Sequence, residues 1–310
     1  MALSRKRQHL YALHPDIAVI PECSQNCLKL CLKDGFEGRW FGDNPRKGLG
    51  VLVAKPFHIA RAQKPRSRWV VPLSITKPKT KSALGPTSGL ASDDARDFLL
   101  IAVWTMPVQG SHVKSYIGQL YQAVVKNPQW FSGKPAIVCG DFNSNKFWDN
   151  KRPKNTENAG NHSAVVGLLE NHRLASAYHH FFSESQGQET QPTYYFWHHK
   201  NRPYHIDYVF LPQRWASQIK RVELGSHATW SKLSDHVPLC VDVGVPAMSK
   251  AKLTAGHYAL RGICYTPGRG AVRAGDPCQD ESREVHPKAT SSALIGTSGC
   301  VKVHADADRG

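Results

Sequence analysis

A carboxylate and an amide follow a short apolar segment in the stretch AIVCGDFNSN, residues 136–145. Asp141 and Asn143 come after Gly140, and residues 136–139 have the composition of a buried β-strand. Side chains at i and i+2 of an extended segment point to the same side, so both polar groups would face one spot at a sheet edge. Such a pair can hold a phosphate oxygen, a metal ion or a water molecule. Ordinary turn formation would also account for Asp and Asn here.

A second carboxylate lies inside an otherwise apolar and aromatic segment, HIDYVFLP at residues 205–212. Asp207 needs a partner there because an isolated buried charge is costly, and His236 in the segment SDHVPL is a candidate. An aspartate that holds one imidazole nitrogen leaves the other nitrogen available to a substrate. Asp235, and Glu22 at the end of the apolar segment IAVIPE, place two further carboxylates at predicted strand ends.

The predicted cluster of carboxylates favours a hard divalent cation. Mg²⁺ or Mn²⁺ prefers oxygen ligands, keeps several waters and binds phosphates, whereas zinc would need more His or Cys. Cys23, Cys27 and Cys31 are spaced by four and would lie along one helix face. We interpret them as an apolar stripe, because no second group of metal ligands matches them.

The elements that must position these residues follow from the apolar pattern. Strands are predicted near residues 16–22, 48–54, 68–75, 97–105, 135–141, 193–196, 205–211 and 237–243, and helices near 3–13, 23–32, 112–126 and 162–174. Strands outnumber helices, and the helices fall between groups of strands. We therefore expect an α/β fold with two packed sheets and helices outside them.

Composition limits the class of protein. The 310 residues are 41% hydrophobic and include eight tryptophans, which indicates a packed core. The net charge of +16 favours a polyanionic partner, although a basic protein without such a partner remains the alternative. No signal peptide and no apolar run of about 18 residues is visible, so we expect no membrane span. The scattered cysteines have no secretory context, and we expect reduced thiols and a cytoplasmic location.

Three stretches interleave basic and aromatic residues: 61–81, 145–154 and 192–202. The first contains seven Lys/Arg and no acidic residue. This pattern suits a phosphodiester backbone with exposed bases, so nucleic acid is the expected partner. Solvated loops and core aromatic residues would give a similar composition.

The composition of the chain changes at about residue 247. Residues 1–246 alternate apolar runs with turns and form the predicted domain. Residues 247–310 are rich in Gly, Ser, Ala and charge, and we expect this tail to be disordered. The tail holds nine Lys/Arg and six Asp/Glu, so most of the positive charge belongs to the predicted domain.

Five segments in chain order resemble the motifs of the endonuclease/exonuclease/phosphatase family, which includes AP endonucleases and pancreatic deoxyribonuclease. They are DIAVIPE, KGLGVLV, GDFN, HIDYVF and SDHVPL, within residues 1–245. The resemblance implies a four-layered α/β sandwich of two packed mixed β-sheets flanked by helices, and metal-dependent cleavage of phosphate esters. It also implies that Glu22 ligates the metal ion and that Asp235 helps to organise the metal side of the site.

The same resemblance implies roles for four further residues. Asp141 would position or deprotonate the attacking water, and Asn143 would hold the scissile phosphate or that water. Asp207 would orient His236, which would stabilise charge on the transition state. These roles match how donors and a cation neutralise charge on phosphate oxygens.

The sequence departs from the family pattern at three places. The family's first strand would precede residue 1, so we expect an N-terminally truncated domain with an unpaired sheet edge. Trp104 and Thr105 stand where relatives have a Tyr or His that faces the phosphate. We expect Trp104 to pack and Thr105 to be able to donate one hydrogen bond there. His205 replaces an Arg, and we interpret it as a solvent-facing strand residue.

The function expected from these observations is a metal-dependent phosphodiesterase, most simply a nuclease acting on DNA or RNA. Two alternatives remain open. One is a catalytically impaired family remnant that binds polyanions, and the other is a phosphatase for a lipid or a small phosphate ester. No obligate protein partner is inferred.

Overall fold

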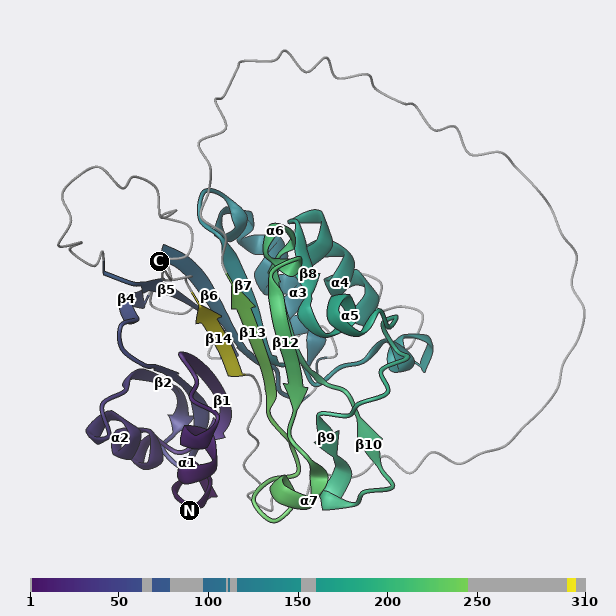
Figure 1. Cartoon of the computed structure of the whole chain (residues 1–310). Coiled ribbons are helices and arrows are strands. Elements are labelled where there is room, and N and C mark those ends of the chain that lie inside the picture. The colour runs from purple at the N-terminus through teal and green to yellow at the C-terminus, as the bar shows by residue number, and fades with distance from the viewer. Residues whose placement is uncertain are drawn as a thin grey trace, which may run out of the picture. The chain divides into compact units, whose positions relative to one another are not determined.

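The computed structural model describes residues 2–62, 69–78, 97–109, 111, 116–151, 160–244 and 300–304. Within these residues most strands belong to two six-stranded sheets (Figure 1). In spatial order the first sheet consists of β12 (Ile219–Leu224), β13 (Leu239–Gly244), β14 (Cys300–His304), β1 (Ile17–Cys23), β3 (Lys47–Val53) and β2 (Glu37–Asn44). The second consists of β4 (His58–Ala62), β5 (Val70–Thr76), β6 (Asp97–Trp104), β7 (Ala136–Asp141), β11 (Asp207–Pro212) and β8 (Leu174–Ser176).

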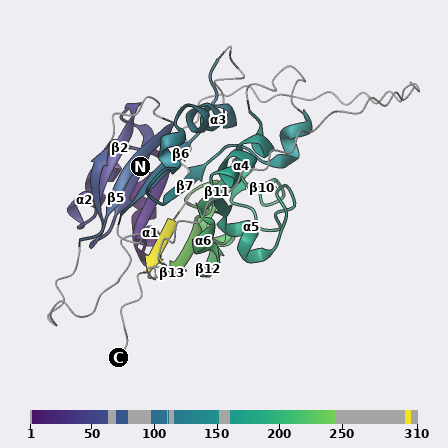
Figure 2. The same ribbon diagram turned by 90° about the horizontal axis from the view of Figure 1, so that it is seen from above.

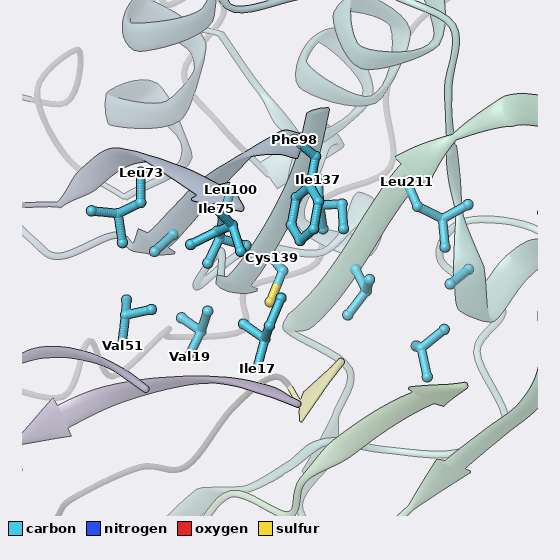
Figure 3. Packing of buried hydrophobic residues seen from close by; sticks show 14 of the residues in the cluster. Ile17, Val19, Val51, Leu73, Ile75, Phe98, Leu100, Ile137, Cys139 and Leu211 are labelled. Atoms are coloured by element: carbon cyan, nitrogen blue, oxygen red, sulfur yellow. The ribbon is translucent and has the colours of Figure 1, made fainter. Parts of the chain in front are cut away.

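The two sheets face each other across one apolar core (Figure 3). Ile17, Val19 and Val51 come from the first sheet, and Leu100 and Cys139 come from the second. All five side chains are essentially inaccessible to water. Burying apolar surface between two sheet faces is the main stabilising contribution to such a fold.

Helices cover the outer face of each sheet (Figure 2). Helices α1 (Ala2–Ala12) and α2 (Gln25–Lys33) lie against the first sheet, where Leu10 and Leu28 pack on Ala18 and Ile20. Helices α3 (Ile117–Lys126) and α4 (His162–Asn171) lie against the second sheet. The order helix, sheet, sheet, helix confirms the predicted four-layered α/β sandwich.

Apolar residues that are consecutive in sequence alternate between the two sides of a strand. In β1, Ile17 and Val19 face the core between the sheets, whereas Ala18 and Ile20 face the outer helices. Both faces are therefore buried, as the unbroken apolar run predicted. Cys27 and Cys31 of the predicted stripe are buried on α2, whereas Cys23 ends β1 and does not belong to the helix. These three residues, Cys139 and Cys240 are free thiols.

Short elements connect the strands of the two sheets. They are α5 (Ala177–Phe182), the two-stranded hairpin of β9 (Tyr194–Tyr195) and β10 (Pro203–Tyr204), α6 (Gln213–Ala216) and α7 (His227–Trp230). The 3-10 helices η2 (Pro128–Phe131), η3 (Lys146–Lys151) and η5 (Phe196–His198) complete the described elements. No helix within the described ranges is long and apolar enough to cross a membrane.

Strand β14 comes from the tail, where the sequence predicted no element. Its backbone runs antiparallel to β1, with Ile17 opposite Val301, and parallel to β13, with Cys240 opposite Cys300. The sheet edge that we expected to be unpaired at β1 therefore has a neighbour. A five-residue segment acquires its place in a sheet through long-range pairing, which local composition does not specify. Residues 245–299 and 305–310 lie outside the described residues, so the boundary at 246 stays a prediction.

Candidate active site

Two of the predicted carboxylates occupy matching positions on neighbouring strands. Strand β7 ends at Asp141, β11 begins at Asp207, and the two residues are directly opposite each other in the antiparallel pair. Asp141 is 3% exposed and Asp207 is fully buried. Like charges placed opposite each other on adjacent strands repel, so this pair requires a compensating group.

His236 supplies part of that compensation. Its Nδ1 lies 2.9 Å from Oδ2 of Asp207, and the imidazole is buried directly before β13. One potential ligand atom each from Asp141, Asp207 and His236 lies within 4.8 Å of the others. Residues separated by almost a hundred positions in the sequence thus form one polar cluster between the two sheets.

Asn143 meets Asp141 through a turn rather than through an extended strand. Its φ is +45°, its backbone N–H donates to Oδ1 of Asp141 at 2.7 Å, and its Nδ2 donates to Oδ2 at 2.8 Å. The i and i+2 geometry that we expected is therefore wrong, because Asn adopts the left-handed region readily and caps its own turn. The same Nδ2 donates to the carbonyl of Thr105 at 2.8 Å, which holds the turn against the end of β6.

Gly140 is required by the close approach of β7 to β6. Its φ is +137°, and a Cβ at this position would lie 2.0 Å from the carbonyl oxygen of Val103. Any other residue would push the two strands apart and displace Asp141, which follows immediately.

The two residues predicted on the metal side are outside the three-residue cluster. Glu22 has a φ of +55°, and its Oε1 lies 2.8 Å from Nζ of Lys47, which also stands 5.6 Å from the centre of the Trp104 ring. Asp235 is 8% exposed, and its carbonyl accepts a hydrogen bond from the N–H of Tyr195 at 2.7 Å. The ion pair with Lys47 was not anticipated, although Lys47 begins a motif that the sequence had singled out.

The buried charged groups of the site shift one another's pKa values. Burial, and then the charge of Asp207, raises the pKa of Asp141 well above its usual range. Burial also raises the pKa of Glu22, partly offset by Lys47. For His236, burial opposes the charged form, but Asp207 outweighs it and, with Asp141 and Asp235, raises the pKa to about 10.

The donor set fits a divalent cation with oxygen ligands. Oδ1 of Asp207 is buried without a hydrogen-bond partner, which is costly unless a ligand satisfies it. The carboxyl group of Asp141 lies near this oxygen, and burial together with the charge of Asp207 raises the pKa of Asp141. Hard carboxylate oxygens with room for water are the ligands that Mg²⁺ and Mn²⁺ take.

Thr193 supports the cluster and was not identified from the sequence. Its Oγ1 accepts hydrogen bonds from the N–H groups of Ile206 at 3.0 Å and Asp207 at 3.1 Å, and its carbonyl accepts one from Val237 at 2.8 Å. One fully buried residue thus contacts the backbone beside both Asp207 and His236. A threonine inside an aromatic and basic stretch carries no local signal of this role.

Two expectations about neighbouring residues need correction. His205 is 4% exposed rather than solvent-facing, because its ring packs 4.4 Å from that of Tyr178 and its Nδ1 lies 2.7 Å from the Gln191 carbonyl. Thr105 is buried and donates its hydroxyl to the carbonyl of Phe142 at 2.6 Å, so this hydroxyl stabilises the turn. Trp104 packs as expected, edge-on against Trp69 at 5.2 Å.

The family predicted from the sequence motifs is also the family whose model matches this chain. The model described as "Endonuclease/Exonuclease/phosphatase family" matches residues 7–236, a range that contains every predicted site residue. No curated protein matches the chain in sequence.

Solved structures share the fold at low identity. A humanized TDP2 from D. rerio aligns with a TM-score of 0.51 and 13% identity, over 76% of this chain and 88% of that chain. A conserved protein of unknown function from Enterococcus faecalis V583 gives the same TM-score, identity and shares of both chains. D. rerio TDP2 complexed with a single strand DNA product aligns with a TM-score of 0.50 and 12% identity, again over 76% and 88%.

Proposed function

We propose that this chain, which belongs to the endonuclease/exonuclease/phosphatase family, is a divalent-metal-dependent phosphodiesterase that cleaves nucleic acid. The observation that carries the proposal is the meeting of Asp141 with the hydrogen-bonded pair of Asp207 and His236. A buried carboxylate can act as a general base, and a buried imidazolium beside it can bind the phosphate as a cation.

Asp141 is the proposed general base. Its carboxylate lies at the end of β7 opposite Asp207, and it takes the proton of the attacking water. Asn143 fixes this carboxylate through two hydrogen bonds, so the base keeps one orientation as the water approaches. The orientation would be lost if the turn at Asn143 opened.

His236 is the proposed donor to the phosphate. Asp207 holds its Nδ1, which directs Nε2–H away from that carboxylate toward a phosphate oxygen. The charge of the imidazolium then neutralises negative charge that develops on the phosphate as the bond breaks. The hydroxyl oxygen of Thr193 accepts a hydrogen bond from the backbone N–H of Asp207 and thereby keeps Asp207 in place.

A divalent cation completes the proposal. Asp141 and Asp207 would hold Mg²⁺ or Mn²⁺, with Glu22 and Asp235 as further candidate ligands, and the ion would polarise the phosphate and stabilise its negative charge. The net charge of +16 supports a nucleic acid as the substrate, because counterion release favours basic proteins on polyanions.

The test measures hydrolysis of bis(p-nitrophenyl) phosphate and of a labelled oligonucleotide, with Mg²⁺, with Mn²⁺ and with a chelator. We expect activity with either cation and none with chelator. Asp141→Asn, Asp207→Asn and His236→Gln should each lower kcat by about 10²–10⁴-fold, since each removes a proton transfer or an oriented charge.

A matched control is Glu223→Gln, which removes a carboxylate from an exposed ion pair with Arg221 on β12. Its rate should equal that of the unchanged protein. Absence of metal-dependent cleavage of both substrates would refute the proposal. Salt-sensitive binding of DNA or RNA without cleavage would then favour the impaired remnant, and cleavage of phosphomonoesters alone would favour a phosphatase.

A further inference from the structure

We propose that a set of aromatic rings beginning beside His236 forms a stacking surface for the unpaired bases of a single-stranded nucleic acid. This aromatic surface consists of Tyr194, Tyr204, Trp148, Phe147, Phe196 and Trp197. The inference rests on the proposed function, because it assigns a substrate class to the same site.

The surface starts at the candidate catalytic imidazole. The ring of Tyr194 lies 4.6 Å from that of His236, centre to centre, and the two residues also form an isolated β-bridge. Tyr194 is partly exposed, so it continues the site toward solvent. A base attached to the phosphate at His236 would meet this ring first.

Two rows of neighbouring rings begin at Tyr194. One row passes through Tyr204 at 6.3 Å and Trp148 at 5.2 Å from Tyr204, and it ends at Phe147, 6.4 Å beyond. Phe147 is 58% exposed. Successive centre-to-centre distances of this size are those at which aromatic rings interact.

The second row is shorter. It passes from Tyr194 to Phe196 at 6.4 Å and then to Trp197, which stacks on Phe196 at 5.1 Å with 13° between the planes. Trp197 is 57% exposed. Each row thus ends in an exposed ring that can stack on a base.

The backbone at Trp197 adopts a conformation that bulky residues disfavour. Trp197 and His198 have φ values of +54° and +61°, which are outliers for bulky side chains. Such strain persists only where the surroundings hold it. Nδ1 of His198 lies 2.7 Å from the Ser231 carbonyl, and Nε2 of His227 lies 3.0 Å from the carbonyl of His198. Contacts with α7 and with the turn that follows it thus hold this loop in place, while the Trp197 side chain remains exposed to solvent.

The charge around the second row favours a nucleic acid. No acidic residue occurs between positions 191 and 205, and Lys200 and Arg202 are exposed there. The guanidinium of Arg202 stands 5.9 Å from the centre of the Phe196 ring. Cations beside aromatic faces bind the phosphate and the base of one nucleotide together.

Single strands fit better than the other polyanions. In a duplex the base faces are stacked on each other and cannot reach Trp197 or Phe147. A lipid surface would require a contiguous apolar patch, whereas Trp197 is followed by exposed His199, Lys200 and Asn201. We therefore infer binding of single strands, and the experiment also tests binding to membranes.

The experiment measures binding of the full chain to three labelled probes by fluorescence anisotropy, in chelator so that no cleavage occurs. The probes are a short single strand, its duplex, and a strand of equal length in which tetrahydrofuran spacers replace all bases. Trp197→Ala and Phe147→Ala should each weaken binding of the base-bearing single strand about tenfold. Binding of the spacer strand should change by less than about twofold, since its phosphates are unaltered.

Two further variants keep the result interpretable. Trp197→Phe retains an aromatic face and should retain most of the binding, which separates stacking from a folding defect. Phe181→Ala removes a ring that is 40% exposed on α5, outside the aromatic surface, and should leave all three affinities unchanged.

Equal losses on the spacer strand, or no loss on the base-bearing strand, would overturn the inference. Loss of binding to phosphatidylserine vesicles without loss of DNA binding would reassign the surface to lipid. The proposed function fails separately, by absent hydrolysis of bis(p-nitrophenyl) phosphate, a substrate with no base. Hydrolysis combined with base-independent binding would refute only the aromatic surface.

Discussion

Asp141 and Asp207 face each other across β7 and β11, residue to residue, with their carboxylates at the same end of the strand pair. Both are buried, and the pKa of Asp141 is raised by that burial and by the charge of Asp207. The sheet thus places two acids where their repulsion opposes folding unless a cation or a proton intervenes.

Divalent cations should stabilise the protein through these carboxylates. A ligand that binds only the folded state at about a hundredfold excess over its Kd adds about 2.7 kcal/mol. We therefore expect Mg²⁺ or Mn²⁺ to raise the Tm measured by circular dichroism. Asp141→Asn should raise the Tm of the metal-free protein and reduce its response to the cation. An equal cation response in Asp141→Asn and in Glu223→Gln would contradict the assigned ligands.

Replacement of Thr193 by valine should loosen Asp207 without changing the volume of the side chain. The variant loses the hydroxyl that accepts from the N–H groups of Ile206 and Asp207, and each buried donor left unsatisfied costs about 1–3 kcal/mol. We expect lower stability in urea and a fall in kcat larger than any rise in KM.

Thr193→Ser is the matched control because it keeps the hydroxyl acceptor. It should restore kcat to within about threefold of the unchanged protein. If Thr193→Ser impairs kcat as much as Thr193→Val, keeping the hydroxyl does not preserve activity, and the hydroxyl of Thr193 has no separate positioning role.

Acid should destabilise a second buried network, around Glu189. Burial acts to raise the pKa of Glu189, but hydrogen bonds from His179, Asn145 and the N–H of Gly187 together lower it to about 2. A lowered pKa stabilises the fold above the unfolded value near 4.5, and this contribution is lost as the pH falls from there through about 2.

Glu189→Gln should therefore flatten the dependence of unfolding free energy on pH in that window, and should cost at most about 3 kcal/mol at neutral pH. Urea unfolding at a series of pH values measures both effects. An unchanged slope below pH 4.5 would show that Glu189 does not titrate as described.

Removal of residues 294–310 should weaken the first sheet. Strand β14 is the only strand among the described residues that joins β13 to β1 by backbone hydrogen bonds. Its loss would separate the strand after His236 from the strand that carries Glu22. We expect a lower Tm and reduced kcat, whereas removal of residues 305–310 alone should change neither. An unaltered Tm after the longer deletion would contradict a stabilising role for β14.

Strands with unbroken apolar runs were predictable from composition. The segments that became β1 and β7 were found within a residue or two, because burial of both faces demands apolar residues throughout. Edge strands such as β2 and β12 were missed, since exposed charged residues interrupt their apolar pattern. Local pattern also misplaced His205, whose exposure depends on which neighbours cover a short strand.

The types of residue available for chemistry were evident in the linear order of the chain: carboxylates at strand ends, one histidine, and a motif series typical of one family. Their relations were not. The register of Asp141 with Asp207, the ion pair of Glu22 with Lys47, the hold of Thr193 on Asp207 and the place of β14 all join residues far apart along the chain. Local propensity and spacing carry no information about such contacts, because they arise only when two sheets pack and choose their register.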